Sequence, residues 1–147
     1  MEDKCIGCRL QEGSFEVNGG FIHESENFNV IQDWIVPIPG FMVIQSKRHL
    51  IGVGEFAEQE YKEFSTFLYE VRKAMKDVLD IQTVYLIQEE DSVHFHVWLL
   101  PVYDWMEKGI ANARKNCYYA RDNMNTEENM KKVNECIQKL KDYFKEK

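Results

Sequence analysis

The chain has 147 residues, and its 44% hydrophobic and 13% aromatic content is typical of one folded domain with a buried core. Its net charge of −7 at pH 7 argues against nucleic-acid polymers and anionic membranes as partners, because binding to either requires clustered Lys and Arg. No apolar run approaches the ~20 residues that cross a bilayer, and the polar residues 1–4 are unlike a signal peptide, so we expect a soluble, cytoplasmic protein.

A C-x-x-C motif, formed by Cys5 and Cys8, stands near the start of the chain. In a reducing compartment this motif indicates either half of a metal site or a redox pair. A redox pair is expected to open a helix after a strand, and no strand is predicted before Cys5, so we favour the metal half-site. The other two cysteines, Cys117 and Cys136, stand singly in helix-like sequence and are expected to be buried apolar residues.

Three short strands are predicted in the first third of the chain. Residues 21–23 and 28–32 are apolar segments separated by the polar residues 24–27, which predicts a hairpin. A loop with Pro and Gly at 37–40 then leads to a third strand at 41–45.

The apolar period changes after this third strand. Between residues 57 and 79 apolar side chains recur at three- and four-residue spacing, with Glu early and Lys late, which predicts a long amphipathic helix. Residues 83–87 follow as a strand, and the acidic loop 88–91 connects that strand to the next one. Two strands joined by a short polar loop indicate an antiparallel hairpin.

The second strand of this hairpin, residues 92–101, carries two closely spaced histidines. Strict alternation predicts that one face of the strand is apolar and that the other carries both histidines and a tryptophan. The apolar face comprises Val93, Phe95, Val97 and Leu99, and the opposite face comprises His94, His96, Trp98 and Leu100. Pro101 supplies no backbone N–H and is expected to end the strand.

The sequence after Pro101 is predicted to be helical. Residues 105–121 form one candidate helix. Residues 126–144 form a second, with Thr126 as its N-cap, Glu in its first turn and Lys towards its end. Paired strands and helices together predict an α+β fold, in which an antiparallel sheet has a long helix between two of its strands.

His94 and His96 would lie side by side on one strand face, with Cα atoms about 6.5–7 Å apart. Such a pair can act as metal ligands, as a nucleophile with its supporting group, or as polar residues satisfied within the fold. We favour a functional role because the pair stands at a strand end beside an acidic loop. A small phosphorylated ligand is compatible with the acidic chain, since a few local donors suffice to bind it. His23 is assigned only a strand-edge or surface position.

Residues 93–101 resemble the motif of the histidine triad (HIT) family, His-φ-His-φ-His-φ-φ with φ apolar, in which Trp98 stands at the third histidine. Residues 39–49 resemble the family's strand that ends in a basic-His pair. Asp33 stands where the family carries an aspartate that binds ribose. Order and spacing match over roughly residues 3–103, including the long helix.

The resemblance implies a HIT-like domain at residues 1–103, with a C-terminal helical extension at 104–147 packed on the same domain. It also implies a homodimer in which two subunits form a continuous sheet, and a small nucleotide bound along the histidine strand.

In the family, the middle histidine of the motif attacks the α-phosphorus of a nucleotide ester, amide or anhydride, and water or another acceptor resolves the covalent nucleotidyl-histidine. This role falls on His96, with His94 beside it and Trp98 at the position that faces the phosphate and the leaving group. A neutral imidazole is nucleophilic near pH 7 while its other N–H is held by a backbone carbonyl. Trp98 cannot act as a general acid, a function worth about 10²–10⁴-fold in rate.

For the nucleotide, the resemblance places Asp33 at the ribose hydroxyls, Ile31 and Trp34 near the base, and Ser92 near the phosphate. Each of these residues has a structural alternative, with Ile31 and Trp34 in the core, Asp33 in a turn, and Ser92 as a loop hydroxyl.

In some bacterial HIT proteins and in the related uridylyltransferases, zinc is held by a C-x-x-C motif, the histidine of the basic-His pair and the first motif histidine. Cys5, Cys8, His49 and His94 match these four positions. Two thiolates and two imidazoles make a closed tetrahedral site, which is structural rather than catalytic. The alternative is a pair of surface cysteines without a metal.

Three functions therefore compete. The first is a HIT-like nucleotide hydrolase or nucleotidyltransferase that acts through His96 on a dinucleoside polyphosphate or a nucleoside phosphoramidate. The second is a nucleotide-binding module that keeps the pocket with little or no catalysis. The third is a structural zinc protein whose C-terminal helices bind partners.

Overall fold

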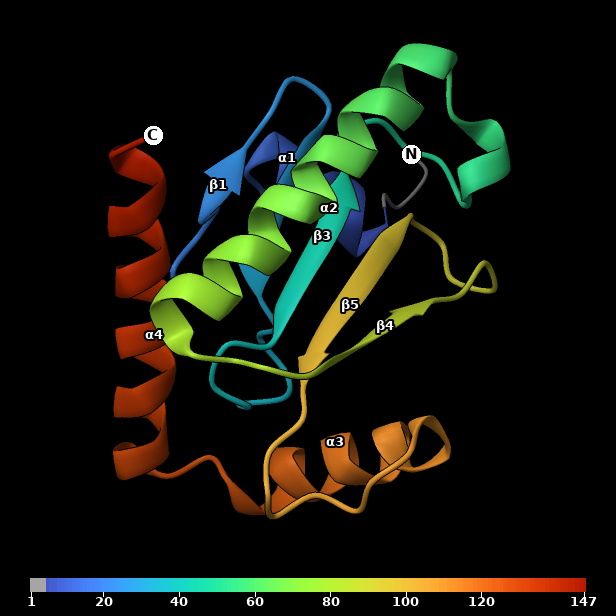
Figure 1. The fold of residues 1–147 in the computed structure, drawn as a ribbon. Helices are drawn as coiled ribbons and strands as arrows, with labels where there is room; N and C mark the ends of the chain where they lie inside the picture. The colour runs from blue at the N-terminus through green and yellow to red at the C-terminus, as the bar shows by residue number, and fades with distance from the viewer. Residues whose placement is uncertain (1–4) are drawn as a thin grey trace.

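A five-stranded antiparallel sheet forms the centre of the computed structural model, which describes residues 5–147 (Figure 1). The order across the sheet is β1-β2-β3-β5-β4. The strands are β1 (His23–Glu24), β2 (Phe28–Gln32), β3 (Met42–Ser46), β4 (Val84–Gln88) and β5 (His96–Pro101). The predicted α+β class and both predicted hairpins are confirmed. The polar start at 1–4, used above against a signal peptide, lies outside the described residues.

Helices cover both faces of this sheet. The long α2 (Glu58–Leu79) crosses one face, α4 (Glu127–Lys145) runs beside α2 and β1, and α1 and α3 lie on the other face (Figure 1). The remaining helices are α1 (Ile6–Glu12), α3 (Ala113–Asn123) and the short 3-10 turns Val53–Glu55 and Ile110–Asn112. None of the helices within residues 5–147 has the length and apolar character required to span a membrane.

Alternation along the strands divides the core in two. Phe28, Ile44 and Val97 face α2 and α4, whereas Ile31 and Val43 face α1 and α3. The register pairs Ile31 with Val43 and Val43 with Trp98, so these three residues form one row across the second face. The next row on that face contains Asn29, Gln45 and His96.

The histidine strand begins later than predicted. β5 starts at His96, and the backbone bends over residues 91–94 before it. The Phe95 N–H donates to the carbonyl of Leu50 at 2.6 Å, so this stretch pairs with the loop after β3 instead of extending the sheet. Val93 is consequently 65% exposed, and its predicted place on the apolar face is wrong.

The C-terminal half confirms one predicted helix and corrects another. The Thr126 hydroxyl accepts from the Asn129 N–H at 3.2 Å, and α4 starts directly after this cap as expected. The helix predicted from residue 105 begins only at Ala113, because Gly109 has φ +101 and the chain turns there. Cys117 is buried as predicted, whereas Cys136 is only half-buried.

The sequence analysis did not predict α1. Its N-cap is Cys5, whose Sγ accepts from the Cys8 N–H at 3.3 Å, and its C-cap is Gly13 in the left-handed region with φ +86. Gly is favoured at that position because it has no Cβ to clash. Only Leu10 of this helix is buried, so α1 contributes a single side chain to the hydrophobic core.

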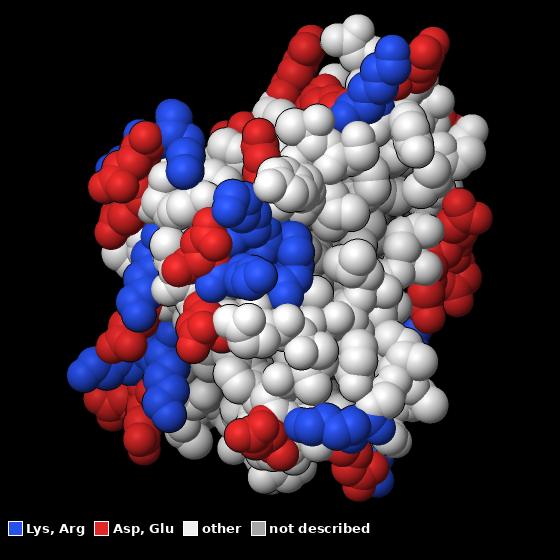
Figure 2. Space-filling view, in the orientation of Figure 1, with Lys and Arg blue, Asp and Glu red and all other residues white. Residues whose placement is uncertain are grey.

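Charged side chains are mixed over the α2 face. Figure 2 shows Lys and Arg interspersed with Asp and Glu around a paler region of uncharged residues. Interspersed charges of both signs keep a surface soluble without creating the strong single-sign field that attracts a polyanion.

Candidate functional site

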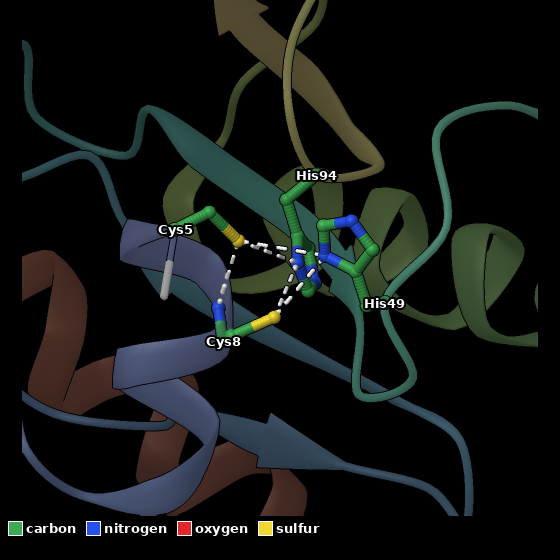
Figure 3. Close-up of side chains that lie close together, drawn as sticks. All are labelled: Cys5, Cys8, His49 and His94. Atoms are coloured by element: carbon green, nitrogen blue, oxygen red, sulfur yellow. Dashed lines mark hydrogen bonds between the residues drawn. The ribbon is translucent and has the colours of Figure 1, made fainter. Parts of the chain in front are cut away.

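Four metal-ligating side chains from three separate segments meet at one end of the sheet. Cys5 and Cys8 come from the start of α1, His49 from the loop after β3, and His94 from the bend before β5. Their ligand atoms all lie within 4.8 Å of one another, and the four side chains point toward a common centre (Figure 3).

The distances within this cluster fit a tetrahedral ion. Cys5 Sγ lies 3.5 Å from His49 Nδ1 and 3.4 Å from His94 Nδ1. Cys8 Sγ lies 3.1 and 3.7 Å from the same two atoms. Zinc–sulfur and zinc–nitrogen bonds at a tetrahedral angle place sulfur and nitrogen about 3.6 Å apart. The cluster can therefore bind a metal with little rearrangement.

His94 is prepared for this role by its second nitrogen. Its Nε2 lies 2.8 Å from the Ser46 carbonyl, so Nε2 carries the proton and Nδ1 presents its lone pair to the cysteines. Burial lowers the pKa of His94, with the Ser46 hydrogen bond opposing it, and this favours the neutral ring that a metal requires.

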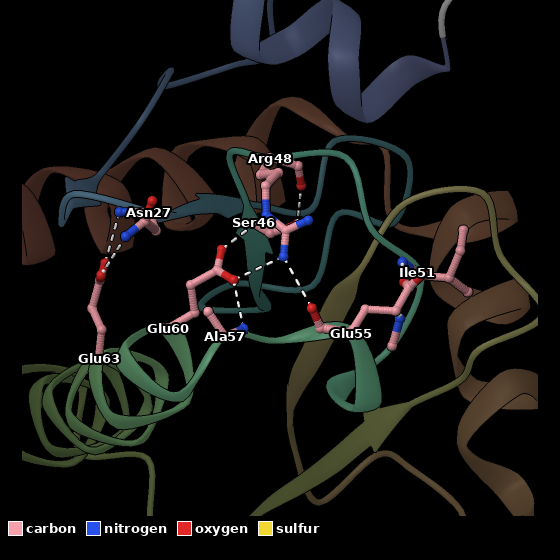
Figure 4. A network of polar contacts seen from close by, with 9 residues as sticks. Asn27, Ser46, Arg48, Ile51, Glu55, Ala57, Glu60 and Glu63 are labelled. Carbon is pink, nitrogen blue, oxygen red and sulfur yellow. Dashed lines mark hydrogen bonds and ion pairs between the residues drawn. The ribbon is translucent and has the colours of Figure 1, made fainter.

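The loop that carries His49 is fixed by a neighbouring ion pair. Arg48 donates to Glu60 of α2 at 2.8 Å and to the carbonyl of Glu55 at 3.0 Å (Figure 4). Glu60 also accepts from the Ala57 N–H, and the Arg48 hydrogen bond lowers its pKa. Arg48 thus anchors the segment between β3 and α2.

A cavity of about 290 Å³ opens directly beside the metal cluster. All seven residues that the sequence analysis assigned to catalysis or nucleotide binding line it: Ile31, Asp33, Trp34, Ser92, His94, His96 and Trp98. The nucleoside candidates come from the end of β2, and the histidines come from β5. The volume is at the lower end of the range for small-molecule sites.

His96 is oriented by the backbone of its neighbour. Its Nδ1 lies 2.9 Å from the His94 carbonyl, so Nδ1 carries the proton and Nε2 keeps a lone pair. The Ser92 hydroxyl donates to the same carbonyl at 3.2 Å. Ser92 therefore lies at the cavity wall and braces the carbonyl that holds the imidazole.

Asp33 lines the same cavity and is held by the turn that follows it. Its Oδ1 accepts from the Ile35 N–H at 2.9 Å and the Val36 N–H at 2.8 Å. Burial raises the pKa of Asp33, and these two hydrogen bonds and the nearby His96 partly offset the rise. A half-buried carboxylate with one oxygen not used by these bonds suits a pair of hydroxyl donors.

Trp98 takes the position after His96 on the same strand face. Its ring contacts Phe41 edge-on at 5.3 Å and lies 6.5 Å from the His96 ring. Arg114 of α3 approaches the indole from outside the strand, with its Cζ 6.0 Å from the ring centroid.

Several lining residues were missed in the sequence analysis. Val43 and Gln45 face the cavity from β3, and the register that pairs them with Trp98 and His96 is the signal that would have revealed them. The wall is completed by Ile6, Gly7 and Leu10 of α1. No local sequence pattern places these residues at the cavity, because α1 reaches it only where Cys5 and Cys8 meet the two histidines. A Cβ at Gly7 would lie 2.3 Å from the His94 ring, so only glycine allows α1 this close.

No family model matches this chain, and no curated protein matches it in sequence. Solved structures do match its fold. A hypothetical histidine triad nucleotide-binding protein from Sulfolobus tokodaii superposes with a TM-score of 0.69 at 18% identity, over 96% of this chain and 94% of its own. A zinc-bound histidine triad family protein from Mycobacterium smegmatis gives 0.64 at 16% identity, over 95% and 97%. A HIT family member from Bacillus subtilis gives 0.62 at 17%, over 93% and 96%.

The likeness extends over most of the chain and establishes a HIT-like fold. The expected architecture, with the long helix between strands and helices at the C-terminus, is confirmed. The helices after Pro101 fall within the superposed length of the Sulfolobus protein, which covers 96% of this chain.

Proposed function

We propose that this protein is a HIT-type nucleotide hydrolase or nucleotidyltransferase that acts at the α-phosphate through His96. One observation carries the proposal: the His96 imidazole, held at Nδ1 by the His94 carbonyl, lines the same cavity as Asp33. A nucleophile on β5 and a hydroxyl-binding carboxylate after β2, two strands away in the same cavity, suit a ligand with a phosphate at one end and a ribose at the other.

The reaction follows from the assigned protonation of His96. Its Nε2 lone pair attacks the α-phosphorus, a P–N bond forms, and the bond from phosphorus to the leaving group breaks with its electron pair on that group. Water or another acceptor then attacks the same phosphorus, its proton leaves, and the P–N bond breaks to return His96. A rigid strand residue suits this role, because covalent catalysis depends on position.

A binding module with little turnover is the second candidate, and Trp98 is the observation that favours it. The indole N–H can donate a hydrogen bond to a phosphoryl oxygen but has no proton to transfer near neutral pH. Leaving groups that need protonation would therefore depart slowly, while nucleotide affinity would persist.

Product formation distinguishes these two functions. The protein is incubated with labelled diadenosine tetraphosphate or adenosine phosphoramidate, and His96→Asn serves as the control. We expect nucleotide product with the native protein and none with the variant. Binding of adenosine monophosphate by both proteins, without product from either, would support the binding module instead.

We also propose zinc as the ion of the four-residue cluster. Two thiolates and two imidazoles are the donor set that zinc prefers, and four protein ligands leave no open position for substrate. The ion would fix α1 and the loops of His49 and His94 as a structural element. We expect one zinc per chain by elemental analysis of purified protein, and loss of the metal in Cys5→Ser with retention in Cys136→Ser.

A homodimer through β4 completes the proposal. β4 is a terminal strand of the sheet, and its Leu86 is 53% exposed on the side of the sheet that α2 covers. An uncovered strand edge readily pairs with a second copy. Light scattering should give twice the chain mass, and Leu86→Glu should shift the protein toward monomer. A native monomer at micromolar concentration would refute this part.

A further inference from the structure

Positive charge is scarce inside the cavity. Among the described residues that line it, Asp33 is the one with a formal charge at neutral pH, and none is Lys or Arg. A ligand with several phosphates therefore needs a positively charged side chain from outside the residues that line the cavity. His96 can contact one phosphate, but it does not neutralise a chain of them.

The order of the strands shows where further phosphates would go. The nucleoside candidates Ile31, Asp33 and Trp34 come from β2 and its end, and His96 comes from β5, two strands away. β4 lies beyond β5. A chain that continues past the α-phosphate, away from the ribose, runs toward β4 and the loop after it.

Arg114 lies in that direction. It projects from α3, stands over the Trp98 ring at 6.0 Å, and pairs with Glu89, the residue after β4. Gln88 pairs with Val97, so Glu89 emerges beside His96 at the sheet edge. The side chains of Arg114 and Glu89 are about half exposed, at 53% and 46%.

We propose that Arg114 binds the β- and further phosphates of the ligand, and that the preferred nucleotides carry a polyphosphate chain. This inference rests on the proposed function of the cavity. An exposed ion pair adds little net stability, so a multiply charged phosphate chain can displace Glu89 from the guanidinium. Arg114 keeps its contact with Trp98 in this exchange. The face of a guanidinium can stack on an indole while the N–H groups in its plane donate hydrogen bonds to phosphate oxygens.

The chemistry of the leaving group agrees with this assignment. A nucleoside polyphosphate departs as an anion and needs no proton, whereas an amine leaving group does. With Trp98 in place of a general acid, a leaving phosphate that Arg114 stabilises by charge is the better match.

Equilibrium binding tests the proposal without turnover. Dissociation constants are measured for adenosine monophosphate and for α,β-methylene adenosine diphosphate, whose α-phosphorus to carbon bond resists cleavage. We expect the native protein to bind the diphosphate analogue roughly tenfold more tightly, the scale of a charge-assisted hydrogen bond. Arg114→Met should remove this preference and leave monophosphate affinity unchanged. Glu89→Gln should strengthen analogue binding severalfold.

Lys115→Met is the matched control. Lys115 is the next residue of α3, is also exposed, and pairs with Glu107 instead of facing Trp98. A preference for the analogue that survives Arg114→Met, or one that Lys115→Met removes equally, would overturn the role of Arg114. Failure of the native protein to bind either nucleotide would overturn the proposed function itself.

Discussion

Two side chains limit the chemistry proposed for the cavity. Trp98 has no proton to transfer near neutral pH, and Asp33 is a partly buried carboxylate. Trp98, which the family resemblance aligns with the third motif histidine, packs edge-on against Phe41. Asp33 is a carboxylate that burial makes costly to ionise, and two backbone N–H groups hold it in place. Both can be changed without touching the proposed nucleophile.

Trp98→His should restore a proton donor beside His96. We expect hydrolysis of adenosine phosphoramidate to rise at least about tenfold, because general acid catalysis contributes about 10²–10⁴-fold when the donor is well placed. Hydrolysis of diadenosine tetraphosphate should change less, since its leaving group needs no proton. Steady-state rates on both substrates check this. An equal change on both would contradict the assigned position of residue 98.

Asp33→Asn should stabilise the protein at neutral pH while weakening nucleotide binding. The folded-state pKa of Asp33 is raised above its ordinary value of 3.8, so ionisation costs more in the folded than in the unfolded chain. The native protein therefore loses stability as pH rises from 3.8 through the folded pKa. Asparagine keeps the Oδ1 acceptor and avoids this loss. Urea unfolding at pH 3.5 and pH 7 should show a stability gain only at pH 7.

At the level of elements, α1 buries little apolar surface. It has seven residues and one buried side chain, yet it supplies two metal ligands and part of the cavity wall. A helix this short is unstable in isolation. We therefore expect the metal to dock α1, and docked α1 to complete the cavity.

Metal removal should consequently open the cavity and lower stability together. With zinc a hundredfold above its dissociation constant, the ion contributes about 2.7 kcal/mol to the free energy of unfolding. After chelation we expect a lower melting temperature, rapid amide hydrogen exchange at residues 6–12 and weaker nucleotide binding. Slow exchange at 6–12 in the metal-free protein would show that α1 docks without the ion.

Gly7→Ala tests whether metal binding depends on the position of α1 when all four metal ligands are kept. The added methyl would meet the His94 ring at 2.3 Å, so α1 must move although all four ligands remain. We expect loss of zinc affinity of at least about tenfold, which corresponds to 1.4 kcal/mol. Gly54→Ala is the control, because a Cβ there meets nothing within 4 Å. Competition with a chromophoric zinc chelator measures both.

The sequence predicted the elements whose side chains repeat regularly and missed those fixed by long-range contacts. The alternation of residues 93–100 and the period of residues 57–79 predicted β5 and α2, although β5 begins only at His96. By contrast, α1 has one buried residue and therefore shows no apolar period in the sequence. The bend before β5 could not be predicted either, because it depends on a hydrogen bond to the distant Leu50 carbonyl. The grouping of His49 with His94 came from the family resemblance, because their separation along the chain gives no local signal.

Across the whole molecule, the C-terminal helices belong to the same two cores as the sheet. Val133, Ile137 and Leu140 of α4 pack with the strands and α2. His23, to which the sequence assigned no role, stacks on Phe144 of α4 at 4.0 Å. We therefore propose that residues 104–147 are required for folding, as an extension packed on the domain that carries the site.

Leu140→Ala tests this integration. Leu140 is 1% exposed, and truncation of a fully buried leucine costs about 2–5 kcal/mol. Lys139→Ala, at an exposed position of the same helix, should change stability by less than about 0.5 kcal/mol. Chemical denaturation followed by circular dichroism gives both values. A small effect at Leu140 would indicate that α4 unfolds separately from the sheet.

His94 links the metal cluster to the cavity that contains His96. One ring nitrogen faces the thiols, the other donates to the Ser46 carbonyl, and the main-chain oxygen of the same residue accepts from the His96 imidazole. A substitution at His94 removes both ring contacts and leaves the carbonyl without the Ser46 contact that fixes its backbone, so we expect variants at this position to lose metal affinity and to shift the His96 ring. A residue that keeps the metal cluster intact at position 94 would therefore also keep the proposed nucleophile, His96, in its orientation.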